Sequence, residues 1–205
     1  MFVQVIQGHV RDAGQVKAAM DQWQRDLAPT AEGWVGSTGG VTDDGEFVGL
    51  ACFADEAAAR RNSDRPEQGR WWDRTSKLFD GEVTFHDSAD VMTDNPGDPD
   101  QAHFVQIMQG RGSDPARAME LMSQDSDKWA KFRPDVLGST ACGYGDGEYT
   151  VAMYFTSEKD ARAGEKKQPP PELAAQMEEM NKLNVEEPRF YDIHSPWINS
   201  PGGSS

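Results

Sequence analysis

An alternation of apolar and polar residues opens the chain and returns about halfway along it. The stretch FVQVIQG runs from Phe2 to Gly8, and FVQIMQG runs from Phe104 to Gly110. An alternation with a period of two is typical of a strand that turns successive side chains to opposite faces of a sheet. Each copy therefore predicts the first strand of a folding unit.

The similarity continues beyond this strand at a fixed offset of 102 residues, the distance from Phe2 to Phe104. The triplet GST at 36–38 returns at 138–140, and DGE at 44–46 returns at 146–148. So many identities in one register indicate a tandem duplication of a unit of about 90 residues. We expect a first unit at 1–92, a linker rich in Pro, Gly and Asp at 93–102, a second unit at 103–197 and a flexible tail at 198–205.

Within each unit the hydrophobic period changes from two to about four and back. After Asp12, which predicts a helix cap, apolar residues such as Val16, Met20 and Trp23 form a helical stripe. Two strands joined by a turn at the DGE triplet follow, then two helical stretches and a last strand at 82–92. The order β-α-β-β-α-β is that of the ferredoxin-like plait, so the predicted fold class is α+β.

The phrases CFADEAAAR at 52–60 and YFTSEKDAR at 154–162 end a strand in an aromatic residue and then begin an acid-rich helix. With the plait order, the chain resembles the dimeric α+β barrel superfamily, and within it the antibiotic-biosynthesis-monooxygenase group. In that family two plaits pack sheet against sheet as a barrel, usually in a homodimer. The resemblance implies that this tandem chain forms the barrel internally as a monomeric pseudo-dimer, or as a homodimer.

Composition and charge exclude several classes of partner. The chain has 205 residues and a net charge of −15, which repels nucleic acid and anionic membrane surfaces. It has no apolar run long enough for a membrane span and no signal-peptide pattern at its start. Two distant cysteines, Cys52 and Cys142, favour a reducing cytoplasm, and four scattered histidines predict no metal site.

The first strand of each unit carries an amide that the resemblance singles out. In the haem-degrading branch of the family, an amide at the position of Gln7 and Gln109 works with a tryptophan and a haem-ligating histidine. Here Arg61 stands near the tryptophan position, and Gly69–Trp71 stands where the histidine is expected. Haem degradation is therefore not expected, and the prediction includes no cofactor.

The two glutamines of each first strand fall on opposite faces of the sheet. We expect Gln7 and Gln109 to face the helices and to hydrogen-bond a ligand, or a nearby helix end or backbone group. Gln4 and Gln106 are expected on the other face.

Further candidates for a site are a base and several aromatic rings. His86 and Tyr154 are candidate proton acceptors, although a lone strand histidine is more often structural. Trp34, Trp71 and Trp72 could contact an aromatic ligand, although core packing is the more common role of such rings.

Two functions remain open from these residues. The first is a cofactor-independent monooxygenase for a small aromatic or quinol-like substrate. In it, His86 or Tyr154 would help to deprotonate the substrate, Gln7 would hold the oxyanion, and the carbanion would react directly with oxygen. The alternative is a non-catalytic protein of the same fold, which binds a small molecule or serves as a scaffold.

Overall fold

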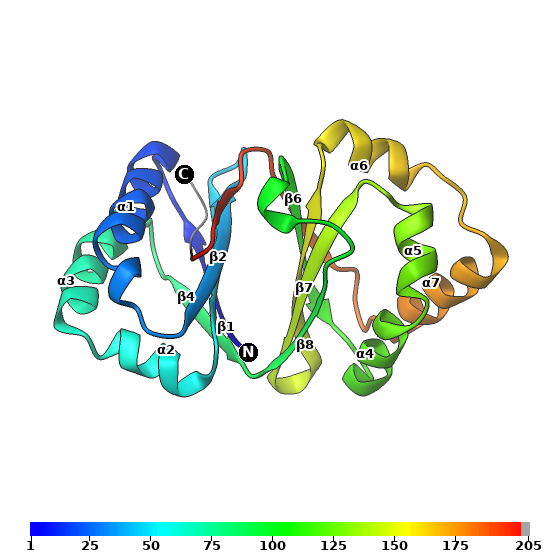
Figure 1. Ribbon diagram of the computed structural model, residues 1–205, viewed down its shortest axis with the longest axis horizontal. Helices are drawn as coiled ribbons and strands as arrows, with labels where there is room; N and C mark the ends of the chain where they lie inside the picture. Colours follow the sequence, from blue (N-terminus) through cyan, green and yellow to red (C-terminus); the bar gives the residue numbers. More distant parts are fainter. Residues whose placement is uncertain (202–205) are drawn as a thin grey trace. The chain divides into compact units, whose positions relative to one another are not determined.

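The computed structural model describes residues 1–201 and divides into two compact units (Figure 1). Unit 1 comprises Met1–Ala89 and the segment from Ser195 onward, and unit 2 comprises Asp90–His194. Of the tail that was predicted to be flexible, residues 202–205 lie outside the described residues. Its first residues complete a short strand, Trp197–Asn199.

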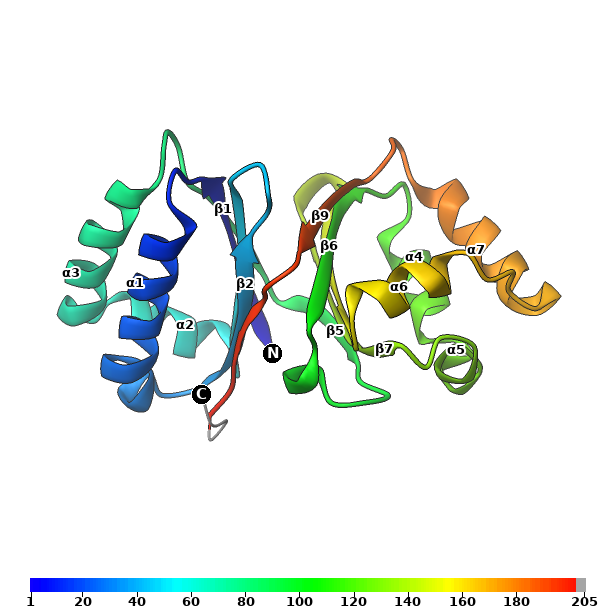
Figure 2. The same cartoon turned by 90° about the horizontal axis from the view of Figure 1, so that it is seen from above.

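Unit 1 is an antiparallel sheet of five strands in the order β10-β2-β3-β1-β4. The helices α1, α2 and α3 cover one face of this sheet (Figure 1 and Figure 2). In chain order its elements are β1 (Phe2–His9), α1 (Ala13–Asp26), the 3-10 turn η1 (Ala28–Thr30), β2 (Trp34–Val41), β3 (Glu46–Phe53), α2 (Glu56–Ser63), α3 (Pro66–Thr75), η2 (Ser76–Leu78), β4 (Thr84–Ser88) and β10 (Trp197–Asn199).

Unit 2 repeats this plan, with the strand order β5-β7-β8-β6-β9. Its elements are β5 (Asp90–Asp94), η3 (Pro99–Gln101), β6 (Phe104–Arg111), α4 (Pro115–Ser123), α5 (Ser126–Phe132), β7 (Val136–Tyr144), η4 (Gly145–Gly147), β8 (Glu148–Phe155), α6 (Glu158–Glu165), α7 (Pro171–Leu183) and β9 (Arg189–Ile193). The predicted α+β class and its two ferredoxin-like units are confirmed.

Local sequence signals explain where these elements begin. The Asp12 carboxylate accepts a hydrogen bond from the backbone N–H of Gln15 at 3.1 Å and so caps α1, and Asp55 caps α2 through Ala58 in the same way. The turn between β2 and β3 contains Gly45 with a φ of +89°, a conformation that side chains rarely adopt. The DGE triplet is therefore a hairpin signal in structure as well as in sequence.

One expected strand is two strands in the structure. The segment predicted as a single strand at 82–92 is interrupted at Ala89; β4 pairs with β1 in unit 1, whereas β5 pairs with β7 in unit 2. At the other end of the chain, β10 follows β9 but pairs with β2 of unit 1. The compact units therefore differ at their ends from the ranges predicted from the sequence.

The core shows which face of each sheet meets the helices. Phe2 packs against Ala28 and Ala58 of the helical layer, and Ile6 packs with Val16 and Met20. Alternation along β1 therefore turns Gln4 toward the helices and Gln7 away from them.

In unit 2, Phe104 packs with Ala161 of α6, which turns Gln106 toward the helices and Gln109 away. The predicted faces of the four glutamines were wrong. Both faces of β1 are buried, with Val3 and Val5 fully buried opposite Phe2, so the pattern could not show which face meets the helices.

Candidate functional site

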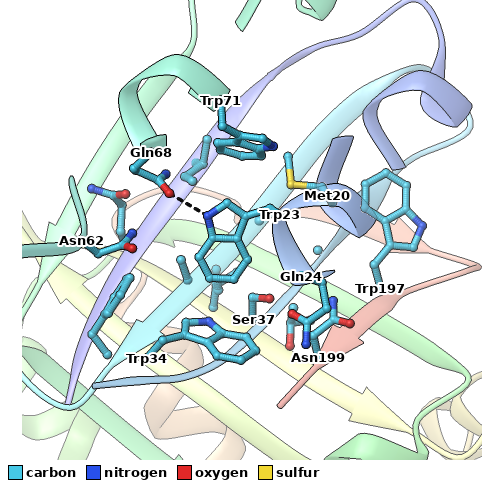
Figure 3. A pocket seen from close by; sticks show the side chains of 18 of the residues that line it. Met20, Trp23, Gln24, Trp34, Ser37, Asn62, Gln68, Trp71, Trp197 and Asn199 are labelled. Atoms are coloured by element: carbon cyan, nitrogen blue, oxygen red, sulfur yellow. Dashed lines mark hydrogen bonds between the residues drawn. The ribbon is translucent and has the colours of Figure 1, made fainter. Parts of the chain in front are cut away.

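A cavity of about 110 Å³ lies between the helices and the sheet of unit 1 (Figure 3). Four of the six tryptophans of the chain line it, and each comes from a different element: Trp23 from α1, Trp34 from β2, Trp71 from α3 and Trp197 from β10. The last strand of the chain thus completes the wall of a cavity in the first unit. Ring walls of this kind suit a flat apolar ligand.

Three contacts hold the indole rings in place. Trp23 meets Trp34 edge to face, with ring centroids 5.3 Å apart and an interplanar angle of 71°. Trp23 Nε1 donates a hydrogen bond to Gln68 Oε1 at 2.7 Å, and Trp71 Nε1 donates to the carbonyl oxygen of Ala19 at 3.0 Å. Because these rings are fixed by packing and by hydrogen bonds, the cavity is largely formed before a ligand arrives.

Two polar atoms at this cavity differ from their neighbours. Trp34 Nε1 and Gln24 Oε1 are buried and have no hydrogen-bond partner among the described residues, and Trp34 is only 7% exposed. A buried donor or acceptor without a partner costs about 1–3 kcal/mol. Both residues line the cavity, so these two atoms are the candidates for polar contacts with an occupant.

The remaining polar lining consists of uncharged side chains. These are Gln4, Gln24, Ser37, Thr38, Asn62, Ser63, Gln68 and Asn199, and no ionisable side chain lines the cavity in the described part of the chain. Gln4 Nε2 donates to Asp87 Oδ1 at 2.9 Å, and Asn62 Oδ1 accepts from Arg65 Nη1 at 3.0 Å. Asp87 and Arg65 are thus bonded to amides of the lining and are not themselves part of it. The cavity therefore favours a neutral ligand.

The structure brings only part of the predicted site to this cavity. Trp34 and Trp71 line it, whereas Trp72 is not part of the lining. Trp72 packs behind Trp71, with ring centroids 6.0 Å apart, and against Phe79 and Phe85 at 6.1 and 5.2 Å. Gln7 is on the sheet face that points away from the helices. We correct the placement of Gln7 and Trp72 accordingly.

His86 also lies away from the cavity. It pairs with Val5 in the β1–β4 register, whereas its neighbour Phe85 points to the helices and contacts Trp72. Successive residues of a strand face opposite ways, so the His86 imidazole is on the face opposite the cavity. Its predicted role as a base within a sheet–helix cavity does not fit this placement.

The predicted residues of unit 2 also lie on the face remote from the helices. Gln109 Nε2 donates to Thr150 Oγ1 at 3.2 Å, and the Tyr144 hydroxyl bonds the same Oγ1 at 2.5 Å. Burial raises the pKa of Tyr144 to about 12, so this phenol is protonated at neutral pH. Tyr154, opposite Val105 in the register, is 6% exposed on that same face.

Sequence reasoning missed several lining residues. The sequence pattern assigns Trp23 to the apolar stripe of a helix, and the repeat places Trp197 at the end of unit 2, whereas the structure places it on the sheet of unit 1. No sequence signal marked these residues, because the bond that corresponds to Trp23–Gln68 in unit 2, from Trp129 Nε1 to Gln176 Oε1 at 2.8 Å, does not follow the offset of 102 residues. The two bonds span 45 and 47 residues of sequence, and they link α1 to α3 in unit 1 and α5 to α7 in unit 2.

The described residues show neither a candidate metal site nor, at Cys52, a thiol of lowered pKa. Residues 1–201 contain no group of three or more His, Cys, Asp or Glu side chains that could hold a metal ion. No helix in this range is long and apolar enough to cross a membrane. Burial raises the pKa of the Cys52 thiol to about 11, which keeps it in its unreactive protonated form.

Comparison with known proteins identifies the fold. No protein-family model and no curated protein sequence matches the chain. Among solved structures, a proposed monooxygenase from Fusobacterium nucleatum subsp. nucleatum has a TM-score of 0.75 at 8% identity, over 99% of this chain and 95% of the other. A proposed monooxygenase from Lactobacillus acidophilus NCFM has a TM-score of 0.68 at 12% identity, over 97% and 99%.

A third structure, an anthrone oxidase-like protein, has a TM-score of 0.68 at 11% identity, over 98% of this chain and 94% of the other. Identities this low show the fold alone. The predicted resemblance is confirmed at that level: over both of its units, the chain has the fold of these monooxygenase-like proteins.

Proposed function

We propose that unit 1 binds a neutral, planar aromatic compound in the tryptophan-lined cavity. The observation that carries this proposal is the buried Trp34 N–H, which has no partner in the described structure and lies in a wall made of indole rings. The rings supply flat apolar surface, and the N–H supplies one directional contact. An uncharged lining excludes carboxylates and amines because it offers no partner for their charge.

The two unpartnered atoms also define the polar groups of the ligand. An oxygen of the ligand accepts the hydrogen bond of Trp34 Nε1, and a hydroxyl of the ligand donates to Gln24 Oε1. Quinol-like compounds carry both kinds of oxygen on a flat ring, and anthrone-like compounds carry the accepting carbonyl oxygen. The cavity of about 110 Å³ is somewhat smaller than an engineered cavity of about 150 Å³ that takes up benzene. It therefore accommodates one ring of the ligand, and any further ring would extend out of it.

A second candidate is cofactor-independent oxygenation of that ligand, which the fold shared with the proposed monooxygenases and the anthrone oxidase-like protein favours. A substrate CH₂ group next to a carbonyl loses a proton, and the carbanion passes its electrons to O₂. One oxygen atom becomes the new carbonyl, and the other leaves as water.

In this scheme the Trp34 N–H stabilises the negative charge on the substrate oxygen. Water takes the proton, since His86 lies across the sheet from this cavity and Tyr154 belongs to unit 2. The role of Gln7 as the oxyanion donor passes to Trp34 for the same reason.

The binding proposal is tested by calorimetric titration of the full chain with hydroquinone and with anthrone. We expect saturable binding, and we expect Trp34→Phe to weaken it about tenfold, the effect of one lost hydrogen bond of about 1.4 kcal/mol. Trp72→Phe is the matched control, because it alters a ring that is not part of the lining and keeps an aromatic ring behind Trp71, so the affinity should change far less. Absence of saturable binding, or equal losses in both variants, would overturn the proposal.

Oxygen uptake separates the two candidates. Uptake with anthrone above the rate without protein, reduced by Trp34→Phe and not by Trp72→Phe, supports oxygenation. Binding without such uptake supports the non-catalytic binder.

A further inference from the structure

Unit 2 contains two cavities that the proposed function does not use. One has a volume of about 300 Å³ and the other about 220 Å³. Seven of the nine methionines of the chain line them: Met92, Met108, Met119, Met122, Met153, Met177 and Met180. This concentration is the most distinctive feature of unit 2 and has no counterpart in unit 1.

The two cavities are adjacent. Met180 of α7 lines both, so the boundary between them includes a single unbranched, flexible side chain. Each cavity also has an exposed apolar residue in its lining: Met177, 43% exposed, for the larger one, and Phe190, 55% exposed, for the smaller one. Met180 is therefore the side chain whose rotation we expect to connect the two methionine-lined spaces.

The lining differs from that of unit 1 in stiffness. At the offset of 102 residues, Ile6 is replaced by Met108, Ala51 by Met153 and Trp34 by Val136. Rigid rings select a flat ligand, whereas methionines adapt to a ligand that bends. Among the described residues, only Gln24 and Trp34, both in unit 1, have a buried polar side-chain atom without a hydrogen-bond partner. The cavities of unit 2 therefore contain no buried polar atom that needs a hydrogen bond from a ligand.

Arg133, the cationic side chain that lines the larger cavity, already has an anionic partner. Its guanidinium is paired with the buried Asp135 at 2.7 Å while it stacks over the Phe155 ring at 5.7 Å. Asp94 also contributes to the lining. A ligand carboxylate would therefore find no unpaired cation in the larger cavity and would meet Asp94 there, and Asp90 and Glu148 in the smaller cavity.

We propose that unit 2 is a second binding site, which takes one unbranched, uncharged aliphatic chain, such as that of a fatty alcohol, along the methionine-lined space. The chain is held by burial of its methylene groups alone. Each added methylene tightens binding about fourfold until the space is filled. This site is independent of the aromatic cavity in unit 1 and stands whether or not that cavity binds its ligand.

The test is NMR of the full chain with ¹³C-labelled methionine methyl groups, titrated with hexanol, octanol, decanol and decanoate. We expect saturable shifts of methyl groups in unit 2, no shift of Met20 in unit 1, affinity that rises with chain length, and weaker binding of decanoate than of decanol. No shift, shifts that include Met20, or equal binding of decanol and decanoate would overturn the proposal.

Two variants sharpen this result. Ala118→Leu adds volume to the smaller cavity, so we expect the gain from octanol to decanol to disappear, whereas Ala18→Leu on the exposed face of α1 leaves it intact. Met180→Ala removes the side chain shared by the two cavities and strengthens decanol binding more than hexanol binding. If Ala118→Leu and Met180→Ala both keep the wild-type chain-length series, the aliphatic chain does not occupy this space.

Discussion

Trp23 and Trp34 stand edge to face across the helix–sheet boundary of unit 1, and they use their indole N–H groups differently. The Trp23 N–H is bonded to Gln68, whereas the Trp34 N–H is buried without a partner in the described structure. The first indole therefore fixes the wall of the cavity, and the second is the one to which the binding proposal assigns a ligand contact. This division of roles leads to predictions about stability as well as binding.

Loss of the Gln68 acceptor should destabilise the protein. Gln68→Ala leaves the part-buried Trp23 N–H without its partner, which costs about 1–3 kcal/mol of unfolding free energy. Urea unfolding measures this loss. Gln15→Ala at the exposed start of α1 is the control and should change stability far less. Equal effects of the two substitutions would contradict a structural role for the Trp23–Gln68 bond.

The C-terminal strand should be required for binding in unit 1, since β10 contributes Trp197 and Asn199 to the cavity. A chain that ends at His194 should lose at least tenfold in hydroquinone affinity by calorimetry, because one ring wall is removed. A chain that ends at Ser200 keeps β10 and should bind like the full chain. Unchanged affinity in the shorter chain would show that the cavity does not depend on this strand.

Two helical glycines should respond in opposite directions to alanine. A Cβ at Gly164 in α6 would overlap the Arg133 guanidinium, which its ion pair with the buried Asp135 holds in place, so Gly164→Ala should destabilise by about 1–3 kcal/mol through overpacking. A Cβ at Gly69 in α3 would meet nothing within 4 Å, so Gly69→Ala should stabilise by about 0.5–1 kcal/mol. Thermal unfolding of both variants measures the contrast, and destabilisation by both would contradict it.

Cys52 should make stability fall at alkaline pH. Burial raises its pKa from 9.0 to about 11 in the folded state. The folded state therefore binds the proton more tightly than the unfolded state, so this contribution is fully present below pH 9 and is lost as the pH rises to about 11. Urea unfolding from pH 8 to 11 should show a steeper decline for the wild type than for Cys52→Ala. Parallel declines would mean that the thiol is not protected.

The sequence was sufficient for the repeat and for the plait order, because duplicated strands, caps and DGE turns are local signals. It was not sufficient for the ends of the units. The break at Ala89 sends Asp90–Asp94 to one sheet, and Trp197–Asn199 returns to the other. Such long-range pairings leave no periodic trace in a single strand of three to five residues.

The site was predicted less well than the fold. Trp34 and Trp71 reach the cavity, but the faces of Gln4 and Gln7 were exchanged, because Val3 and Val5 bury the second face of β1 as fully as Phe2 buries the first. Alternation fixes which residues share a face and does not fix which face meets the helices. The face of His86 was wrong for the same reason, because His86 pairs with Val5 and so shares the face of β1 that points away from the helices.

The most direct test of the binding proposal is the ¹H–¹⁵N NMR signal of the six indole N–H groups during titration with hydroquinone. We predict that the Trp34 signal moves downfield as its N–H gains an acceptor, and that the signals of Trp72 and Trp129 stay in place. Saturable binding that leaves the Trp34 signal unmoved, or a titration in which no indole signal responds, would contradict the account.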